Sequence, residues 1–216
     1  MSFTVMLQQL LMGFGKSILI FVLTLLFSIP LALPVAFGRM SKNALLRNLI
    51  KIYISVMRGT PLMLQLLFLF YAPYVLAGVS LSQTWRITAV IVGFSINYAA
   101  YFAEIYRSGI QSMPVGQYEA ARVLGYSKNQ TFFLIILPQV VKRILPAVTN
   151  EVITLVKDTS LAFALSYMEL FSIAKQIVAK ESTIMPLVIA AVFYYVFNFV
   201  VAYAMERLEK NMAYYR

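Results

Sequence analysis

The chain has 216 residues, of which 61% are hydrophobic, and its formal net charge is +10. Ordinary soluble domains are about 45–50% apolar, so the surplus favours a protein that lies in lipid. With no cysteine and no histidine, the chain lacks a disulfide framework, thiolate chemistry and the commonest general base and metal ligand. A basic chain suits nucleic acid or a membrane protein with positive cytoplasmic loops. The distribution of the charges favours the membrane, and we expect no nucleic-acid partner.

Five apolar segments predict an all-α membrane protein, since a membrane span usually takes about 17–25 mostly apolar residues. The predicted spans, with approximate bounds, are 13–37, 61–77, 85–106, 145–163 and 184–205. Between the first two lies a basic amphipathic segment, 38–57, whose apolar residues recur at helical spacing. It either lies at the membrane interface or lengthens the following helix. We expect one transmembrane domain over residues 1–216, without tandem repeats or linkers.

The charges between the predicted spans indicate which loops lie in the cytoplasm. Residues 38–58 and 107–143 are basic with few acids, and Lys and Arg collect in cytoplasmic loops. Residues 78–84 are uncharged and residues 164–183 are nearly balanced, so we expect both on the outer side. The amino terminus is therefore predicted to lie outside and the carboxy terminus inside.

The stretch 118–139 is the most polar interruption of the chain, and it lies between the third and fourth predicted spans. Gly125 offers the left-handed residue that ends many helices. Ser127 and Gln130 have capping-box spacing, which predicts a second helix, and we expect Pro138 to end that helix. A two-helix element of small residues suits docking into a partner's groove; the alternative is an ordinary connecting loop.

The spacing of these residues resembles the EAA loop of importer-type ABC permeases. Glu119-Ala120-Ala121 is followed by Gly125 and, after nine further residues, by Ile135-x-Leu137-Pro138. Other segments resemble the polar amino-acid branch of that family: Arg58-Gly59-Thr60-Pro61, Ala103-Glu104-Ile105-Tyr106-Arg107, Gly116-Gln117 and Lys157-Asp158-Thr159-Ser160-Leu161. The resemblance spans about residues 13–208.

This resemblance implies a permease subunit of an ATP-driven amino-acid importer, multi-pass in a bacterial inner membrane. The implied partners are ABC ATPase subunits in the cytoplasm, a second permease copy or paralogue, an extracellular substrate-binding protein, the amino-acid substrate and membrane lipid. ATP and magnesium would bind the ATPase subunits, and we expect no cofactor in this chain. In an alternating-access cycle the residues that couple to the ATPase mechanically would be Glu119, Ala120, Ala121 and Gly125.

The sequence argues against an enzyme. Gly15-Lys16-Ser17 mimics the end of a phosphate-binding loop, but the first glycine of that motif would fall at Leu10. No complete ATP-binding motif, metal-ligand cluster or nucleophile–base pair is visible in the sequence. The alternative to an ABC permease is a stand-alone secondary transporter or channel for small polar solutes. Such transporters often show internal repeats, which this sequence lacks.

Polar side chains within the predicted spans indicate a substrate path, because such groups are costly in lipid and usually face a bundle interior or water. In the fourth span Asn150, Glu151, Thr154, Lys157 and Asp158 form one broad stripe. We predict that it faces a second stripe on the third span. The residues assigned to the path are Asn97, Tyr101, Glu104, Thr154, Asp158 and, from the second span, Gln65. In the alternative, Lys157 and Asp158 pair with neighbours and merely hold the helix ends.

Arg58 and Thr60 lie where the second predicted span begins. We expect Thr60 to cap that helix. Arg58 is either a positive anchor at the cytoplasmic face or an inner-gate residue that pairs with Glu104 or with an acid of another chain. Lys157 is assigned to the same group of gate or helix-end residues.

Overall fold

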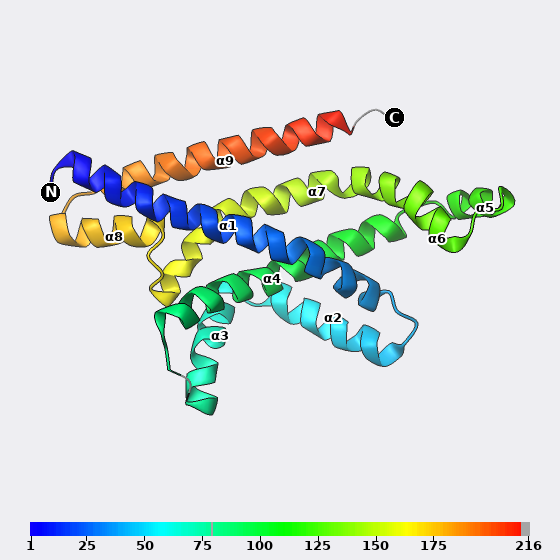
Figure 1. Ribbon diagram of the computed structural model, residues 1–216, viewed down its shortest axis with the longest axis horizontal. Coiled ribbons are helices and arrows are strands. Elements are labelled where there is room, and N and C mark those ends of the chain that lie inside the picture. The colour runs from blue at the N-terminus through cyan, green and yellow to red at the C-terminus, as the bar shows by residue number, and fades with distance from the viewer. Residues whose placement is uncertain (79, 213–216) are drawn as a thin grey trace.

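The computed structural model describes residues 1–78 and 80–212, and every regular element in these ranges is a helix (Figure 1). In chain order the elements are α1 (Phe3–Arg39), α2 (Ala44–Gly59), α3 (Leu62–Ala77), α4 (Gln83–Gln111), α5 (Val115–Val123), α6 (Lys128–Gln130), the π-helix η1 (Thr131–Ile136), α7 (Leu137–Asp158), the 3-10 helix η2 (Thr159–Leu165), α8 (Leu170–Glu181) and α9 (Met185–Asn211). The predicted all-α class is confirmed.

Within residues 1–78 and 80–212, four helical segments are long and apolar enough to cross a membrane: α1, α4, the continuous segment Lys128–Leu165 and α9. The predicted span 61–77 corresponds to α3, which has 16 residues, fewer than the roughly 20 that a span needs. It becomes a fifth candidate only together with α2, and the chain bends by 112° between the two helices. Thr60 is extended there, because a residue before proline avoids the helical region.

Two helical regions extend beyond the sequence prediction. α1 begins ten residues before the predicted bound at 13, and the Ser2 side chain accepts a hydrogen bond from the Val5 N–H at its start. α8 lies inside the segment 164–183 that we expected to be a connection. The buried Glu169 carboxylate caps α8 by accepting 2.7 Å hydrogen bonds from the backbone N–H groups of Phe171 and Ser172. Burial raises the pKa of Glu169.

The expectation that Pro138 ends a helix is wrong, because the helical segment runs unbroken from Lys128 to Leu165. A proline ring clashes with the carbonyl four residues earlier and supplies no N–H. The backbone immediately before Pro138 is a π-helix, in which the Leu137 N–H donates to the Phe132 carbonyl five residues back. The wider turn accommodates the proline. The part of the stretch 118–139 that begins at Lys128 is therefore continuous with the predicted fourth span.

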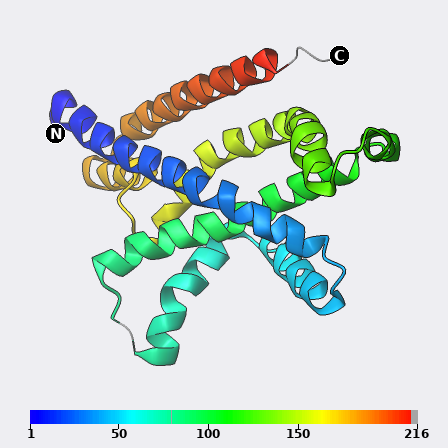
Figure 2. The same ribbon diagram turned by 45° about the vertical axis from the view of Figure 1, so that its right-hand side comes forward.

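α1 packs along α4 through small side chains, and this contact forms the centre of the bundle (Figures 1 and 2). The small buried residues of α1 include Thr24, Ser28, Ala32 and Ala36. Those of α4 include Ala89, Ala99, Ala100 and Ala103. In lipid, where apolar surface alone does not drive association, small residues let helix backbones approach closely. Larger apolar residues such as Phe94 and Phe102 fill the space beside them.

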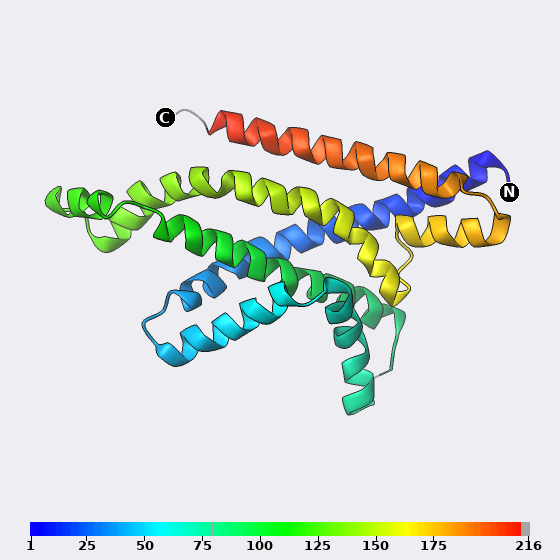
Figure 3. The ribbon, with the colours of Figure 1, turned by 180° about the vertical axis from the view of Figure 1, so that it is seen from behind.

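The molecule has two distinct ends along its long axis. The amino terminus and α8 lie at one end, whereas α5, α6 and the turn between α1 and α2 lie at the other (Figures 1 and 3). α3 points away from the bundle, roughly across this axis (Figure 1). The basic connections therefore gather at one end, as the charge pattern led us to expect.

Candidate translocation path and coupling surface

The coupling element, which comprises α5, α6 and the turn between them, has the local geometry predicted from its residues. Gly125 has a φ of +79°, and just beyond α5 the Tyr126 N–H donates to the Ala121 carbonyl at 3.0 Å. Ser127 accepts from the Gln130 N–H, and the Gln130 side chain accepts from the Ser127 N–H. The left-handed glycine and the capping box are both confirmed.

This element presents an apolar surface that the other described residues of the chain leave exposed. Its most exposed apolar side chains are Val115 (70%), Val123 (87%) and Leu124 (73%). Glu119 and Ala120 are exposed beside them, so a partner protein could contact both. Ala121, by contrast, is only 1% exposed. Its small side chain fixes the packing of the element from inside, and a docking partner would not touch it directly.

The two predicted polar stripes meet only in part: Glu151, Thr154 and Asp158 of the fourth span line a cavity with Asn97 and Tyr101 of the third, whereas Asn150 and Lys157 are exposed. The Tyr98 hydroxyl on α4 donates a 2.7 Å hydrogen bond to Asp158 Oδ2 at the end of α7. Asn97 Nδ2 donates to Gln65 Oε1 at 2.8 Å and to the Met57 carbonyl at 3.0 Å. These bonds tie α4 to α7, to α3 and to the last turns of α2.

A cavity of about 280 Å³, the deep cavity, lies between these helices. Its polar lining consists of Thr60, Asn97, Tyr98, Tyr101, Glu151, Thr154 and Asp158. The structure thus brings four predicted path residues together: Asn97, Tyr101, Thr154 and Asp158. Gln65 supports this group through its bond to Asn97. The lining offers the carboxylates of Glu151 and Asp158, which accept hydrogen bonds, and the Tyr101 hydroxyl, which can donate one, whereas Asn97 and Thr154 already donate to groups of the chain.

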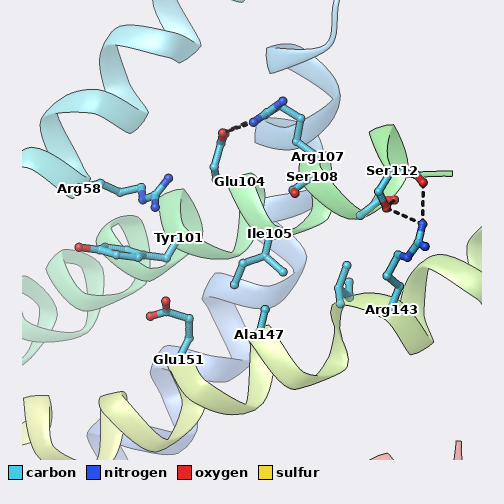
Figure 4. Close-up of a pocket in the computed structure, with 12 residues that line it drawn as sticks. Arg58, Tyr101, Glu104, Ile105, Arg107, Ser108, Ser112, Arg143, Ala147 and Glu151 are labelled. Carbon is cyan, nitrogen blue, oxygen red and sulfur yellow. Dashed lines mark hydrogen bonds and ion pairs between the residues drawn. The ribbon is translucent and has the colours of Figure 1, made fainter. Parts of the chain in front are cut away.

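A second cavity of about 570 Å³, the inner cavity, lies nearer the coupling element because it reaches the last residues of α4 (Figure 4). Its charged lining consists of Arg58, Glu104, Arg107, Arg143 and Glu151. Glu104 accepts two hydrogen bonds from Arg107, and Arg143 donates to the Ser112 carbonyl at 2.6 Å. Two of the three arginines are therefore fixed by partners within the chain.

The Arg58 and Glu104 side chains do not form the ion pair that we considered from the sequence. Arg107, one helical turn further along α4, pairs with Glu104 instead. Arg58 lies over the aromatic face of Tyr101, with 5.2 Å between its guanidinium carbon and the ring centroid. A stacked arginine remains available for another acid, which a simple membrane anchor would not require.

The prediction that Thr60 caps the following helix is wrong. Pro61 occupies the N-cap position of α3, and no side chain bonds there. Thr60 Oγ1 instead donates to the Val56 carbonyl of α2 at 2.8 Å and accepts from Gln65 Nε2 at 2.7 Å. The side chain therefore belongs to the end of α2, because the bend directs it backwards.

Lys157 and Asp158 do not pair with neighbouring charges in the described part of the chain. Asp158 accepts from a tyrosine, whereas Lys157 is exposed. Sequence reasoning missed Tyr98 and named Glu151 only as part of the polar stripe, although both line the deep cavity. Glu151 lies within the predicted polar stripe, and Tyr98 directly follows Asn97. Their positions in the sequence suggested that they lie near the path, but only the packing of the helices shows that they line the cavity.

Comparison with known proteins places the chain among transport proteins. A family model described as "Binding-protein-dependent transport system inner membrane component" matches residues 28–214. The chain is 40% identical to a probable amino-acid ABC transporter permease of Bacillus subtilis over 94% of this chain and 88% of that relative. It is 35% identical to the L-cystine transport system permease of the same organism, over 93% and 85% of the two chains.

Solved structures agree with this placement. The chain superimposes on the crystal structure of an amino acid ABC transporter with histidines with a TM-score of 0.86 and 29% identity, covering 98% of this chain and 99% of the other. An inward-facing structure of the MetNI methionine ABC transporter matches with a TM-score of 0.77 and 19% identity, over 99% and 100% of the two chains. At that identity the second match establishes the fold alone.

Proposed function

The chain belongs to the family of binding-protein-dependent transport system inner-membrane components, and on this premise we propose that it forms the membrane path for a polar amino acid. It is a permease subunit of an ABC transporter, a non-catalytic membrane component. The observation that carries the proposal is the deep cavity, where polar groups from α4 and α7 meet inside an otherwise apolar bundle. Relatives named for amino acids, cystine and glutamine support this class of substrate.

The lining of the deep cavity suits a zwitterion. Glu151 and Asp158 can accept hydrogen bonds from an ammonium group, while the Tyr101 hydroxyl, which donates to no other group in the described part of the chain, can donate to a carboxylate. About 280 Å³ leaves room for one free amino acid. Because polar groups in lipid are expensive, their convergence on one cavity favours a path over scattered helix contacts.

A second permease copy or paralogue completes this path. α7 exposes a polar stripe at helical spacing, formed by Arg143, Asn150, Thr154 and Lys157. Nothing in the described part of the chain covers it, and a polar stripe facing lipid would be unfavourable. A second permease packed against this face would enclose the stripe and the open sides of both cavities.

The coupling element connects the path to cytoplasmic ATPase subunits, which bind ATP and magnesium. Its exposed apolar surface suits a groove on such a subunit, with Glu119 and Ala120 at the contact and Gly125 as the bend. Because the segment Lys128–Leu165 is continuous, movement of the docked element would be transmitted directly to α7. This rigid connection supports an alternating-access mechanism.

The orientation in the membrane follows from the charges and the two ends of the molecule. We assign the coupling-element end to the cytoplasm of a bacterial inner membrane, with the amino terminus outside. The α2–α3 pair serves as a broken second span, which gives five spans in one transmembrane domain. The outer end would then receive an extracellular substrate-binding protein.

The decisive experiment reconstitutes the chain with its ATPase and substrate-binding protein in proteoliposomes. Uptake of radiolabelled glutamine, cystine and arginine is measured with ATP present or absent on the ATPase side. We expect uptake of at least one of them only with ATP, and stimulated ATP hydrolysis in its presence. Uptake by the chain alone, without ATPase or ATP, would instead favour the secondary transporter or channel.

A further inference from the structure

The two cavities meet at two shared residues. Of the residues that line the deep cavity and the inner cavity, Tyr101 and Glu151 belong to both. Tyr101 comes from α4 and Glu151 from α7, so the boundary is made by the two helices that carry the polar stripes. A solute that moves from the deep cavity directly into the inner cavity passes these side chains.

Arg58 lies at the same boundary. Figure 4 shows Arg58 and Glu151 on opposite sides of the Tyr101 ring, and the guanidinium lies 5.2 Å from the ring centroid. Arg58 comes from the second-last residue of α2, immediately before the 112° bend. A side chain at the end of a helix, next to a bend, changes position with a small rotation of that helix relative to α4 and α7.

The charges around this boundary leave the Glu151 carboxylate without a partner in the described part of the chain. Glu104 is occupied by Arg107, and Arg143 donates to Ser112. In the described part of the chain no ion pair includes Arg58 or Glu151. A planar guanidinium can stack on an aromatic ring and bind a carboxylate at the same time, and such a pair strengthens as water leaves the cavity.

We propose that Arg58, Tyr101 and Glu151 form an inner gate, in which an Arg58–Glu151 ion pair across Tyr101 separates the deep cavity from the inner cavity. This proposal rests on the proposed function and names the residues that close its inner side. In the structure the gate is open, because Arg58 and Glu151 do not form an ion pair. When the ATPase subunits close, α7 and the end of α2 approach, the pair forms, and the deep cavity loses its connection to the cytoplasm.

The test measures access to the deep cavity from the cytoplasmic side. Because the chain has no cysteine, Thr154→Cys introduces a single thiol in the deep cavity. The full complex is placed in inside-out vesicles and treated with membrane-impermeant methanethiosulfonates, one cationic and one anionic. Using both charges separates gating from simple attraction of the reagent. Labelling rates are compared without nucleotide and with the ATPase subunits trapped by ATP and vanadate.

We expect trapping to slow labelling by about tenfold, because the weakest coupling energies measured between close charge pairs correspond to a change of about that size. Arg58→Glu or Glu151→Arg should abolish this protection for both reagents, and the swapped double variant should restore it. Lys51→Glu is the matched control, since Lys51 is an exposed cation on the same helix as Arg58 and lines neither cavity, and it should keep the protection. If a reversed variant fails to assemble, Arg58→Gln and Glu151→Gln provide the same comparison without a repulsive charge.

Full protection in both single variants would refute the gate, and so would a swapped variant that still lacks protection. Neither result would touch the proposed function, which depends on ATP-driven uptake by the wild-type complex. Failure of that uptake with intact protection would have the opposite meaning, namely that the gate exists but the solute is not one of the amino acids offered.

Discussion

The hydroxyl of Tyr98 and the carboxylate of Asp158 join two helices across 60 residues of sequence. This contact lies in the deep cavity, so one carboxylate oxygen is held by the protein while the group still lines the cavity. Asp158 therefore contributes both to helix association and to the path. The two contributions can be measured separately, because different substitutions remove its hydrogen bond and its charge.

Tyr98→Phe should destabilise the complex by about 1 kcal/mol, since it removes a hydrogen bond between membrane helices but leaves the Asp158 charge. Asp158→Asn should behave in the opposite way, because an amide oxygen still accepts from Tyr98 but no longer attracts an ammonium group. Thermal stability of the purified complex and amino-acid uptake distinguish the two. Wild-type uptake by Asp158→Asn would leave Asp158 as a helix contact only.

Gly125→Val should reduce transport while the protein still inserts. A side chain at the φ of +79° costs roughly 1–2 kcal/mol, although no atom lies within 4 Å of an added Cβ. The strain would therefore turn the coupling element rather than create a clash. Gly116→Val is the control, since its surroundings are equally open and its φ is not left-handed. Equal uptake and ATP hydrolysis in both variants would show that the bend is merely permissive.

Pro138→Ala should lower the number of amino acids transported per ATP. The alanine supplies an N–H and removes the ring that the π-helix accommodates, so the segment can relax to an α-helix. A shift of one residue in register rotates the coupling element by about 100° relative to α7. The control is Pro146→Ala, which changes the other proline of the same continuous segment, within α7. A normal transport-to-hydrolysis ratio for Pro138→Ala would contradict this view.

Gly13→Ala should destabilise the protein by about 1–3 kcal/mol through overpacking. An added Cβ would lie 3.0 Å from Leu170 Cα and 3.1 Å from the Glu169 carbonyl carbon, and these backbone atoms cannot rotate away. Gly15→Ala, two residues further along α1, meets nothing within 4 Å and should gain about 0.5–1 kcal/mol from helix propensity. Relative to the wild type, the melting temperature should fall for Gly13→Ala and rise for Gly15→Ala.

Cysteines introduced at Ser82 and Ser127 should label from opposite sides of the membrane. Both positions are exposed, and they belong to the loops that charge assigns to the outside and to the cytoplasm. In sealed right-side-out vesicles an impermeant maleimide should label Ser82→Cys alone, and both should react after permeabilisation. Labelling of both in sealed vesicles would overturn the assigned orientation.

The sequence alone determined the features that depend on local chemistry. Gly125 and the Ser127–Gln130 capping box were predictable because each involves residues a few positions apart. The stripes that carry Asn97 and Thr154 were predictable because polar groups in lipid have to turn towards one another. Motif spacing likewise identified the family before any geometry was known.

The tertiary structure decided how distant segments share these groups. The sequence did not show which prolines interrupt a helix. Before Pro61 the chain bends by 112°, whereas before Pro138 a π-helix continues the helical segment. From the sequence we considered a pair of Glu104 with Arg58, whereas in the structure Arg107 holds Glu104. Spacing along one helix cannot rank partners on other helices. Only the packing of α2 against α4 left Arg58 stacked on Tyr101, with Glu151 of α7 beyond the ring.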